Sequence, residues 1–125
     1  MARVLLVDDE EYIRQIYRKK LADEGYQVFT AAVGPNLWSR IDRVEPEVVI
    51  LDLKLVDYDG LELLLEIRNR HDDLPVILCS ADNTFKEDLR AIAANYYVMK
   101  SFDLSELKRA IQRALGENNS GRLTA

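Results

Sequence analysis

Residues that could handle a phosphoryl group stand directly after short apolar runs of this chain. Three are carboxylates, one is a hydroxyl and one is an amine: Asp8, Asp9, Asp52, Ser80 and Lys100. A cluster of carboxylates is unfavourable unless a hard cation neutralises it, and Mg²⁺ prefers a few carboxylates with waters and phosphate oxygens. An amine and a hydroxyl opposite the metal could hold the other oxygens of a phosphoryl group. The set therefore fits transfer of a phosphoryl group to a carboxylate.

The apolar runs themselves predict five short β-strands. Three of them are almost continuously apolar, which is typical of strands that are covered on both faces. The predicted strands are Val4–Val7, Gln27–Ala31, Val48–Leu51, Val76–Cys79 and Tyr96–Met99.

Helical periodicity separates the strands and follows the last one, because apolar residues recur three or four positions apart. The expected core faces are Ile13, Ile16, Tyr17 and Leu21; Leu37, Ile41 and Val44; Leu61, Leu64 and Leu65; Phe85, Leu89, Ile92 and Ala93; and Leu104, Leu107, Ile111 and Leu115. The spacings in Thr84–Glu87 and Asp103–Glu106 predict capping boxes at the start of the last two helices. Gly25 and Gly116 stand where helix C-caps are expected.

Five repeats of strand and helix predict an α/β protein with a doubly wound parallel sheet and right-handed crossovers. In such a sheet, sites form beyond the carboxyl ends of the strands, where the strand order reverses. Taken singly, each residue of the set has an ordinary explanation, such as acids at a helix N-terminus or a solvated lysine. The predicted site depends on all four strand ends agreeing.

The composition limits what else this chain can be. It has 125 residues, of which 48% are hydrophobic, so we expect one domain at 1–116. The polar, aperiodic segment 117–125 is expected to be a flexible tail or the start of a linker. The formal charge of −5 disfavours direct binding to nucleic acid or to a membrane surface. With a single cysteine, a single histidine and no apparent signal peptide or membrane span, we expect a cytoplasmic protein.

Five motifs between residues 2 and 115 resemble those of the receiver domain of two-component response regulators. They are Val4–Glu10 (VLLVDDE), Val49–Leu53 (VILDL), Asp59-Gly60, Ser80-Ala81 and Tyr97–Lys100 (YVMK). Each is weak alone, and together they are specific. The resemblance implies the flavodoxin-like (βα)5 fold of the chemotaxis response regulator, with strand order 2-1-3-4-5. It also implies a signalling domain that catalyses only its own phosphorylation and autodephosphorylation.

The same resemblance implies which residues accept the phosphoryl group and hold the metal. Asp52 would be the phosphoacceptor, attacking the phosphohistidine of a sensor histidine kinase or a histidine phosphotransfer protein. Mg²⁺ would be held by Asp8, Asp9 and Asp52, together with the backbone carbonyl of Lys54.

The resemblance further implies a switch. Lys100 and Ser80 would bind phosphoryl oxygens, and the inward movement of the Ser80 hydroxyl would free space for Tyr97. This change would alter the face formed by Phe85–Leu115. That face would signal to a downstream protein or to an output domain missing from this chain, and a phosphorylation-dependent homodimer is a further expected partner.

The sequence departs from the family pattern at three places. Ser101 follows Lys100 where the family usually has a proline after a cis bond. We expect a trans bond here, because a cis bond before a residue other than proline costs about 3 kcal/mol. Val56 also replaces a common proline, which predicts a more mobile loop. A short segment between Ser80 and Lys100 predicts a short fourth helix, Phe85–Ala93.

Two charged residues could control how long the phosphoryl group persists. Lys54 and Asp82 lie two positions after Asp52 and Ser80, so their side chains could pair over the phosphoryl group and hinder attacking water. Two separately solvated charges are the alternative, because an exposed ion pair is worth only about 0–1 kcal/mol.

A phosphohydrolase of the haloacid-dehalogenase type is the main alternative function, since it would also use Asp52 as nucleophile with Mg²⁺. That chemistry needs a second acid two residues later, where this chain has Lys54. A flavodoxin-like electron carrier would need a Ser/Thr/Gly-rich phosphate loop at the position of Asp8–Glu11. A receiver that has lost its activity is a weaker option, because the set of site residues is complete.

Overall fold

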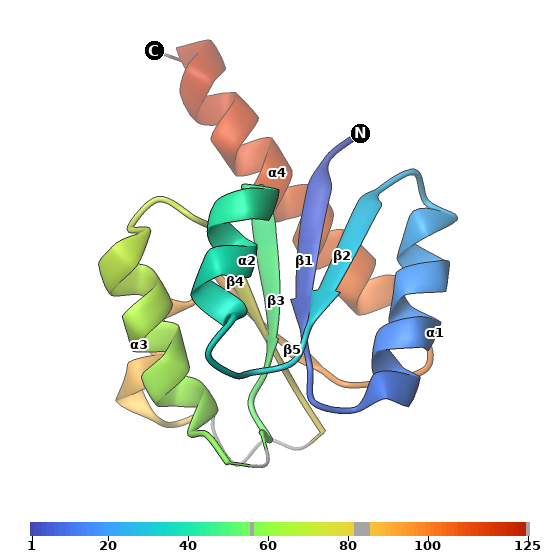
Figure 1. The fold of residues 1–125 in the computed structure, drawn as a ribbon. Helices are drawn as coiled ribbons and strands as arrows, with labels where there is room; N and C mark the ends of the chain where they lie inside the picture. The colour runs from blue at the N-terminus through green and yellow to red at the C-terminus, as the bar shows by residue number, and fades with distance from the viewer. Residues whose placement is uncertain (56, 82–85, 125) are drawn as a thin grey trace.

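A five-stranded parallel sheet forms the centre of the fold, with the strand order β2–β1–β3–β4–β5 (Figure 1). The computed structural model describes residues 1–55, 57–81 and 86–124, with side chains through residue 116. Its strands are β1 (Arg3–Val7), β2 (Gln27–Ala31), β3 (Val48–Asp52), β4 (Val76–Ser80) and β5 (Tyr96–Met99). The predicted α/β fold and the predicted strand order are confirmed.

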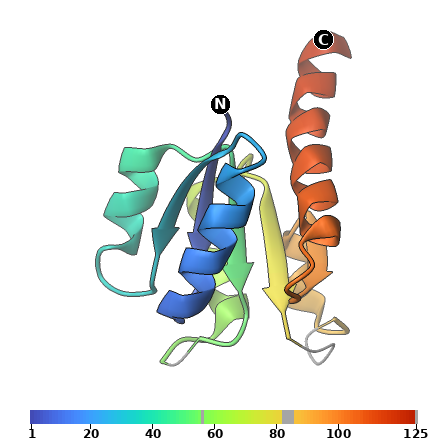
Figure 2. The ribbon, with the colours of Figure 1, turned by 90° about the vertical axis from the view of Figure 1, so that its right-hand side faces the viewer.

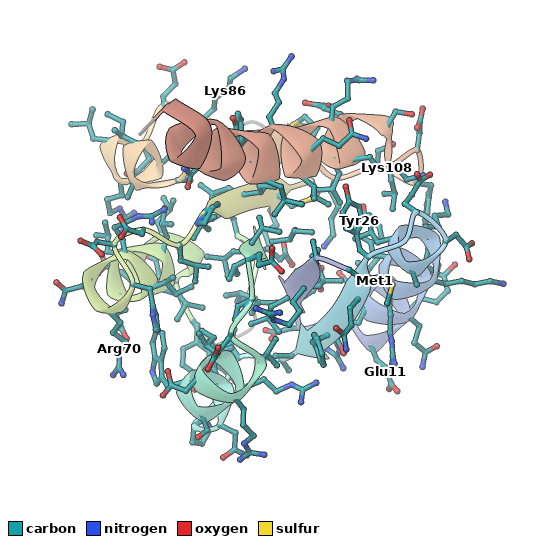
Figure 3. The ribbon with its side chains drawn as sticks, turned by 90° about the horizontal axis from the view of Figure 1, so that it is seen from above. Met1, Glu11, Tyr26, Arg70, Lys86 and Lys108 are labelled. Carbon is teal, nitrogen blue, oxygen red and sulfur yellow. The ribbon has the colours of Figure 1, made fainter. Side chains whose placement is uncertain are left out.

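Helices cover both faces of this sheet. They are α1 (Glu11–Ala22), α2 (Leu37–Val44), α3 (Gly60–Arg70), the short 3₁₀ helix η1 (Leu89–Ala93) and α4 (Ser105–Thr124). Seen from above, α1 and α4 lie on one face, and α2 and α3 lie on the other (Figure 3). The strands therefore run through the middle of a three-layer domain.

The central strands are apolar without a break because both of their faces are buried. Val4 and Leu6 contribute to the core layer under α1 and α4, whereas Leu5 and Val7 contribute to the layer under α2 and α3. Successive side chains of a strand point to opposite faces, so a sheet covered on both sides needs apolar residues at every position.

Two of the expected helical core faces are wrong in part. The segment after β4 forms only the five-residue η1 in the described residues, and its Leu89 and Ile92 are 81% and 78% exposed. Ala93 packs against the core as expected, and Ala91 and Ala94 do so in place of Leu89 and Ile92, because residues three apart share one face of a 3₁₀ helix. In α3, Leu65 lies at the exposed edge of the helix, and Leu63 is buried in its place.

The helix ends agree with expectation only in part. Gly25 has a φ of +94° after α1, as a C-cap glycine requires. Gly116 lies inside α4, which continues to Thr124 and through most of the segment predicted as a tail (Figure 2). Asp103 accepts a hydrogen bond from the Ser105 backbone N–H at 3.0 Å, but its own N–H donates to Ser101 Oγ at 3.1 Å, where the predicted capping box would have used Glu106. Thr84 lies outside the described residues, and the domain boundary at residue 116 stays a prediction.

None of the helices in the described part of the chain is both long enough and apolar enough to cross a membrane.

Candidate functional site

The carboxyl ends of the strands lie together at one edge of the sheet, the lower edge in Figures 1 and 2. The register explains which residues meet there. Leu51 in β3 pairs with Val7 in β1, so Asp8 and Asp52 leave neighbouring strands at the same level. On the other side, Ser80 pairs with Met99, which brings Lys100 to the same edge. Strand order reverses beside β1, where this type of sheet forms its sites.

Lys100 joins the two strands that carry the buried aspartates. Its ammonium nitrogen lies 2.8 Å from Asp8 Oδ2 and 3.2 Å from Asp52 Oδ2. Its backbone N–H donates a hydrogen bond to the carbonyl oxygen of Ser80 at 2.6 Å. Burial works against the charged form of Lys100, but the hydrogen bond with Asp8 and the charge of Asp52 outweigh it and raise the pKa. The lysine therefore stays protonated between the two carboxylates.

The two aspartates are almost completely buried. Asp8 is 1% exposed and Asp52 is 3% exposed. The backbone N–H groups of Glu10 and Lys54 donate to their Oδ1 atoms at 2.9 Å and 3.3 Å, respectively. Burial, followed by the charge of Asp8, raises the pKa of Asp52, and the nearby Lys100 only partly offsets this. Two buried carboxylates that share one lysine leave excess negative charge at this edge.

Asp9, Ser80 and Tyr97 lie around this centre. Asp9 Oδ1 accepts a hydrogen bond from the Val33 N–H at 3.3 Å. Ser80 is fully buried at the end of β4. Tyr97 is half-buried on the neighbouring strand β5 and packs against the core layer that α2 and α3 cover. The acid, the serine and the tyrosine thus come from the loops and strands that border the buried aspartates.

Lys54 is exposed, and its backbone pairs with that of Asp59 across the loop after β3. The proposed partner of its side chain, Asp82, lies outside the described residues, as does Val56. The Lys100–Ser101 bond is trans, as the sequence predicted, since the described residues contain no cis peptide bond.

The donor set at this edge suits Mg²⁺. The donors expected from the sequence are the carboxylates of Asp8, Asp9 and Asp52 and the backbone carbonyl of Lys54, all of which are oxygen ligands. Within the described ranges, no group of three or more His, Cys, Asp or Glu side chains is arranged to hold a metal ion. Mg²⁺ does not need one, because it keeps several waters and often uses only one or two carboxylates with phosphate oxygens. The excess negative charge and the oxygen donors therefore fit this cation.

Cys79, one residue before Ser80, is 3% exposed, and burial raises the pKa of its thiol to about 12. A thiol that stays protonated is a poor nucleophile. The nearby cysteine therefore packs in the core.

Three contacts to the site could not be foreseen from residue periodicity. Arg14 donates a hydrogen bond from Nη1 to the Asp8 carbonyl oxygen at 2.6 Å. Gly60 lies so close to the backbone of Leu53 that a Cβ atom would be 2.7 Å from the Leu53 Cα. The hydroxyl of Tyr17 contacts the backbone of Ser101. For this last contact the sequence held a signal, because serine in place of proline adds an N–H that needs an acceptor.

Comparisons with known proteins agree with this geometry. The sequence model of the response regulator receiver domain matches residues 4–112. The regulatory protein AtoC of Escherichia coli is 36% identical over 116 residues, which are 90% of this chain and 25% of AtoC. The DNA-binding transcriptional regulator NtrC of Rhizobium meliloti is 36% identical over 118 residues, or 93% of this chain and 24% of NtrC. The chain thus spans about a quarter of the length of these curated relatives.

Solved structures of the response regulator protein TrrA from Thermotoga maritima have the same fold. The complex of TrrA with Mg²⁺ and BeF superposes with a TM-score of 0.87 at 37% identity, covering 92% of this chain and 100% of TrrA. TrrA in complex with the histidine kinase ThkA gives a TM-score of 0.84 at 36% identity, covering 92% and 99%. With its fold, its strand-end residues and these matches in agreement, the chain belongs to the response regulator receiver domains of two-component signalling.

Proposed function

We propose that this receiver domain accepts a phosphoryl group on Asp52. The observation that carries the proposal is the position of Asp52, which is buried at the sheet edge with Lys100 and the second buried acid Asp8 beside it. A carboxylate oxygen of Asp52 attacks the phosphorus of a phosphohistidine. The new O–P bond forms as the N–P bond breaks, and the imidazole nitrogen keeps the bonding electron pair.

The residues around Asp52 hold the charge that this step creates. Mg²⁺, held by Asp8, Asp9, Asp52 and the Lys54 carbonyl, would supply positive charge against the phosphoryl oxygens. Lys100, at the end of β5, provides a second, fixed positive charge. Its ammonium can bond a phosphoryl oxygen while it keeps its contact with Asp8. The buried Ser80 hydroxyl supplies a further donor at the end of β4.

Ser80 and Tyr97 transmit the phosphorylation state of Asp52 to the surface of the domain. When the Ser80 hydroxyl donates to a phosphoryl oxygen, it moves inward and Tyr97 fills the vacated space. The packing of β4 and β5 then changes from one arrangement to the other. The face Phe85–Leu115 changes with them. Its exposed apolar side chains, Leu89 and Ile92, support a role in binding a partner. Lys54 paired with Asp82 would slow hydrolysis of the phosphoryl group.

A cytoplasmic histidine kinase or histidine phosphotransfer protein is the proposed donor. The complex of TrrA with the histidine kinase ThkA supports this choice. The longer relatives AtoC and NtrC support an output domain or a downstream protein as the receiver of the signal, and a phosphorylated homodimer is a second proposed assembly. The net charge of −5 supports a domain that does not bind nucleic acid directly. The geometry offers no support for the hydrolase alternative, because the exposed Lys54 stands where a second acid is needed.

Incubation with acetyl phosphate and Mg²⁺, followed by intact-mass measurement, tests the proposal. The wild-type chain should gain the mass of one phosphoryl group, and Asp52→Asn should gain none. Asp57→Asn changes an exposed aspartate of the same loop and is the matched control, so it should be modified like the wild type. A chain that gains no Asp52-dependent adduct from acetyl phosphate or from a phosphorylated kinase would contradict the proposal.

A further inference from the structure

The backbone of Ser101 is held by a single buried side chain from α1. The Tyr17 hydroxyl donates a hydrogen bond to the Ser101 carbonyl oxygen at 2.7 Å. The Ser101 N–H donates in turn to the Tyr17 hydroxyl oxygen at 3.2 Å. Tyr17 is only 1% exposed, so the surrounding core fixes the position of its ring. One hydroxyl therefore bonds both backbone polar groups of Ser101, the N–H of the Lys100–Ser101 peptide and the C=O of the Ser101–Phe102 peptide.

This contact matters because Ser101 directly follows Lys100. A proline at position 101 would have no N–H, whereas serine brings a backbone donor that needs an acceptor. Tyr17 is that acceptor, and it also donates to the carbonyl oxygen. The residue at position 17 thus complements the residue at position 101, although 84 positions separate them.

Lys100 is consequently fixed on both sides. On its N-terminal side, its own N–H bonds to the Ser80 carbonyl oxygen at 2.6 Å. On its C-terminal side, the backbone N–H and C=O of Ser101 are bonded to Tyr17, and Lys20 on the same helix donates to the Phe102 carbonyl oxygen at 2.6 Å. Between these points the ammonium reaches two carboxylates at 2.8 Å and 3.2 Å.

We propose that Tyr17 is a positioning residue for phosphoryl transfer: its hydroxyl holds the trans Lys100–Ser101 backbone in the place from which the Lys100 ammonium reaches the phosphoryl group on Asp52. The inference rests on the proposed function of Asp52. Tyr17 touches neither the phosphoryl group nor the metal and acts through Lys100.

The electrostatic surroundings keep the Tyr17 hydroxyl in the form that the contact needs. Burial and then the nearby Cys79 raise its pKa, so it remains protonated and continues to donate. Its ring also belongs to the same core layer as the half-buried Tyr26, which offers a matched tyrosine without a bond to the loop among the described contacts.

The test compares Tyr17→Phe with Tyr26→Phe in the whole chain. Calorimetry measures the affinity for Mg²⁺ alone and then for beryllium fluoride at saturating Mg²⁺, because beryllium fluoride has the tetrahedral shape of a phosphoryl group. Tyr17→Phe should weaken beryllium fluoride binding by about 2- to 12-fold, the equivalent of a lost hydrogen bond, and slow phosphorylation by acetyl phosphate. Its Mg²⁺ affinity should stay that of the wild type, because the carboxylates are untouched.

A double-mutant cycle separates positioning from a general loss of structure. In a Lys100→Ala background, Tyr17→Phe should have no further effect on beryllium fluoride binding. Equal losses in Mg²⁺ and beryllium fluoride affinity, an additive cycle, or a Tyr17→Phe protein that behaves like Tyr26→Phe would each overturn the inference.

Failure of the proposed function and failure of the Tyr17 inference give different results. If the wild type takes no phosphoryl group from any donor, the proposed function fails; if the wild type is active and only the Tyr17 effect is missing, this inference alone fails. Should Tyr17→Phe not fold, amide hydrogen exchange in the wild type replaces it. A Ser101 N–H that exchanges as fast as an unbonded loop amide would overturn the inference, and a protected one would support it.

Discussion

The ammonium of Lys100 lies 2.8 Å from a carboxylate oxygen of Asp8, and the aspartate is 1% exposed. This ion pair connects β5 to β1, which are separated in the sheet by β3 and β4. A buried ion pair stabilises little by itself, but removing one partner leaves an uncompensated charge. The receiver site is therefore an electrostatically coupled unit, in which each charged residue affects both the stability and the chemistry of the others.

Loss of the lysine should destabilise the metal-free protein strongly. Lys100→Met is expected to lower the free energy of unfolding by about 3–5 kcal/mol near neutral pH, because two buried carboxylates lose their counter-ion. Urea unfolding in the presence of a chelator measures this. Lys108→Met removes an exposed pair with Glu24 and should change the free energy by less than about 1 kcal/mol. Equal losses of stability in the two variants would show that Lys100 is not needed to neutralise the buried carboxylates.

The raised pKa of Asp52 makes stability depend on pH with a definite sign. A carboxyl whose pKa is higher in the folded protein than in the unfolded chain opposes folding when it is ionised. That unfavourable contribution is complete above the folded pKa and disappears as the pH falls below the unfolded value. Asp52→Asn should therefore raise the free energy of unfolding of the metal-free protein near neutral pH, with a smaller gain in acid.

Urea titrations at several pH values, with Asp57→Asn as the exposed control, measure this gain. A pH-independent difference between Asp52→Asn and the wild type would contradict the assignment of the buried charge to Asp52.

Mg²⁺ should stabilise the protein, and Asp9 should be needed for it. A ligand at about 100 times its Kd adds about 2.7 kcal/mol to the free energy of unfolding. Asp9→Asn is expected to weaken Mg²⁺ binding by about tenfold or more, since the metal loses a charged oxygen ligand. Calorimetric titration, with chelator addition to reverse the effect, measures both quantities. Glu10→Gln alters the exposed neighbouring acid and should bind Mg²⁺ like the wild type.

Position 60 should tolerate no side chain, because Gly60 lies against the backbone of Leu53. A Cβ at position 60 would lie 2.7 Å from the Leu53 Cα and 2.8 Å from its carbonyl oxygen, and backbone atoms cannot swing away. Gly60→Ala should lower the free energy of unfolding by about 1–3 kcal/mol. It should also slow phosphorylation, because Leu53 joins Asp52 to Lys54. Thermal unfolding and the acetyl phosphate assay measure the two effects.

Gly34→Ala is the control for this substitution, because a Cβ at Gly34 meets no atom within 4 Å and the residue has no positive φ. A Gly60→Ala protein as stable and as reactive as Gly34→Ala would show that the contact has no influence on the site.

The sequence determined the sheet and which residues meet at its carboxyl edge. Continuous apolar runs predicted the buried strands, because a strand covered on both faces must be apolar at every position. The residues that leave those strands had to meet, because the carboxyl ends of parallel strands share one edge. Asp8, Asp52, Ser80 and Lys100 could therefore be placed together without any knowledge of their contacts.

Only the tertiary structure decided how those residues are held. Whether the segment before β5 turns as a 3₁₀ helix and exposes Leu89 and Ile92 depends on its packing against neighbouring elements, and local periodicity does not contain that information. The approach of Gly60 to Leu53 and the bonds between Tyr17 and Ser101 likewise join elements that the chain brings together only on folding. Hydrogen bonds and close contacts depend on distances of a few tenths of an ångström, and the packing of all three layers sets those distances.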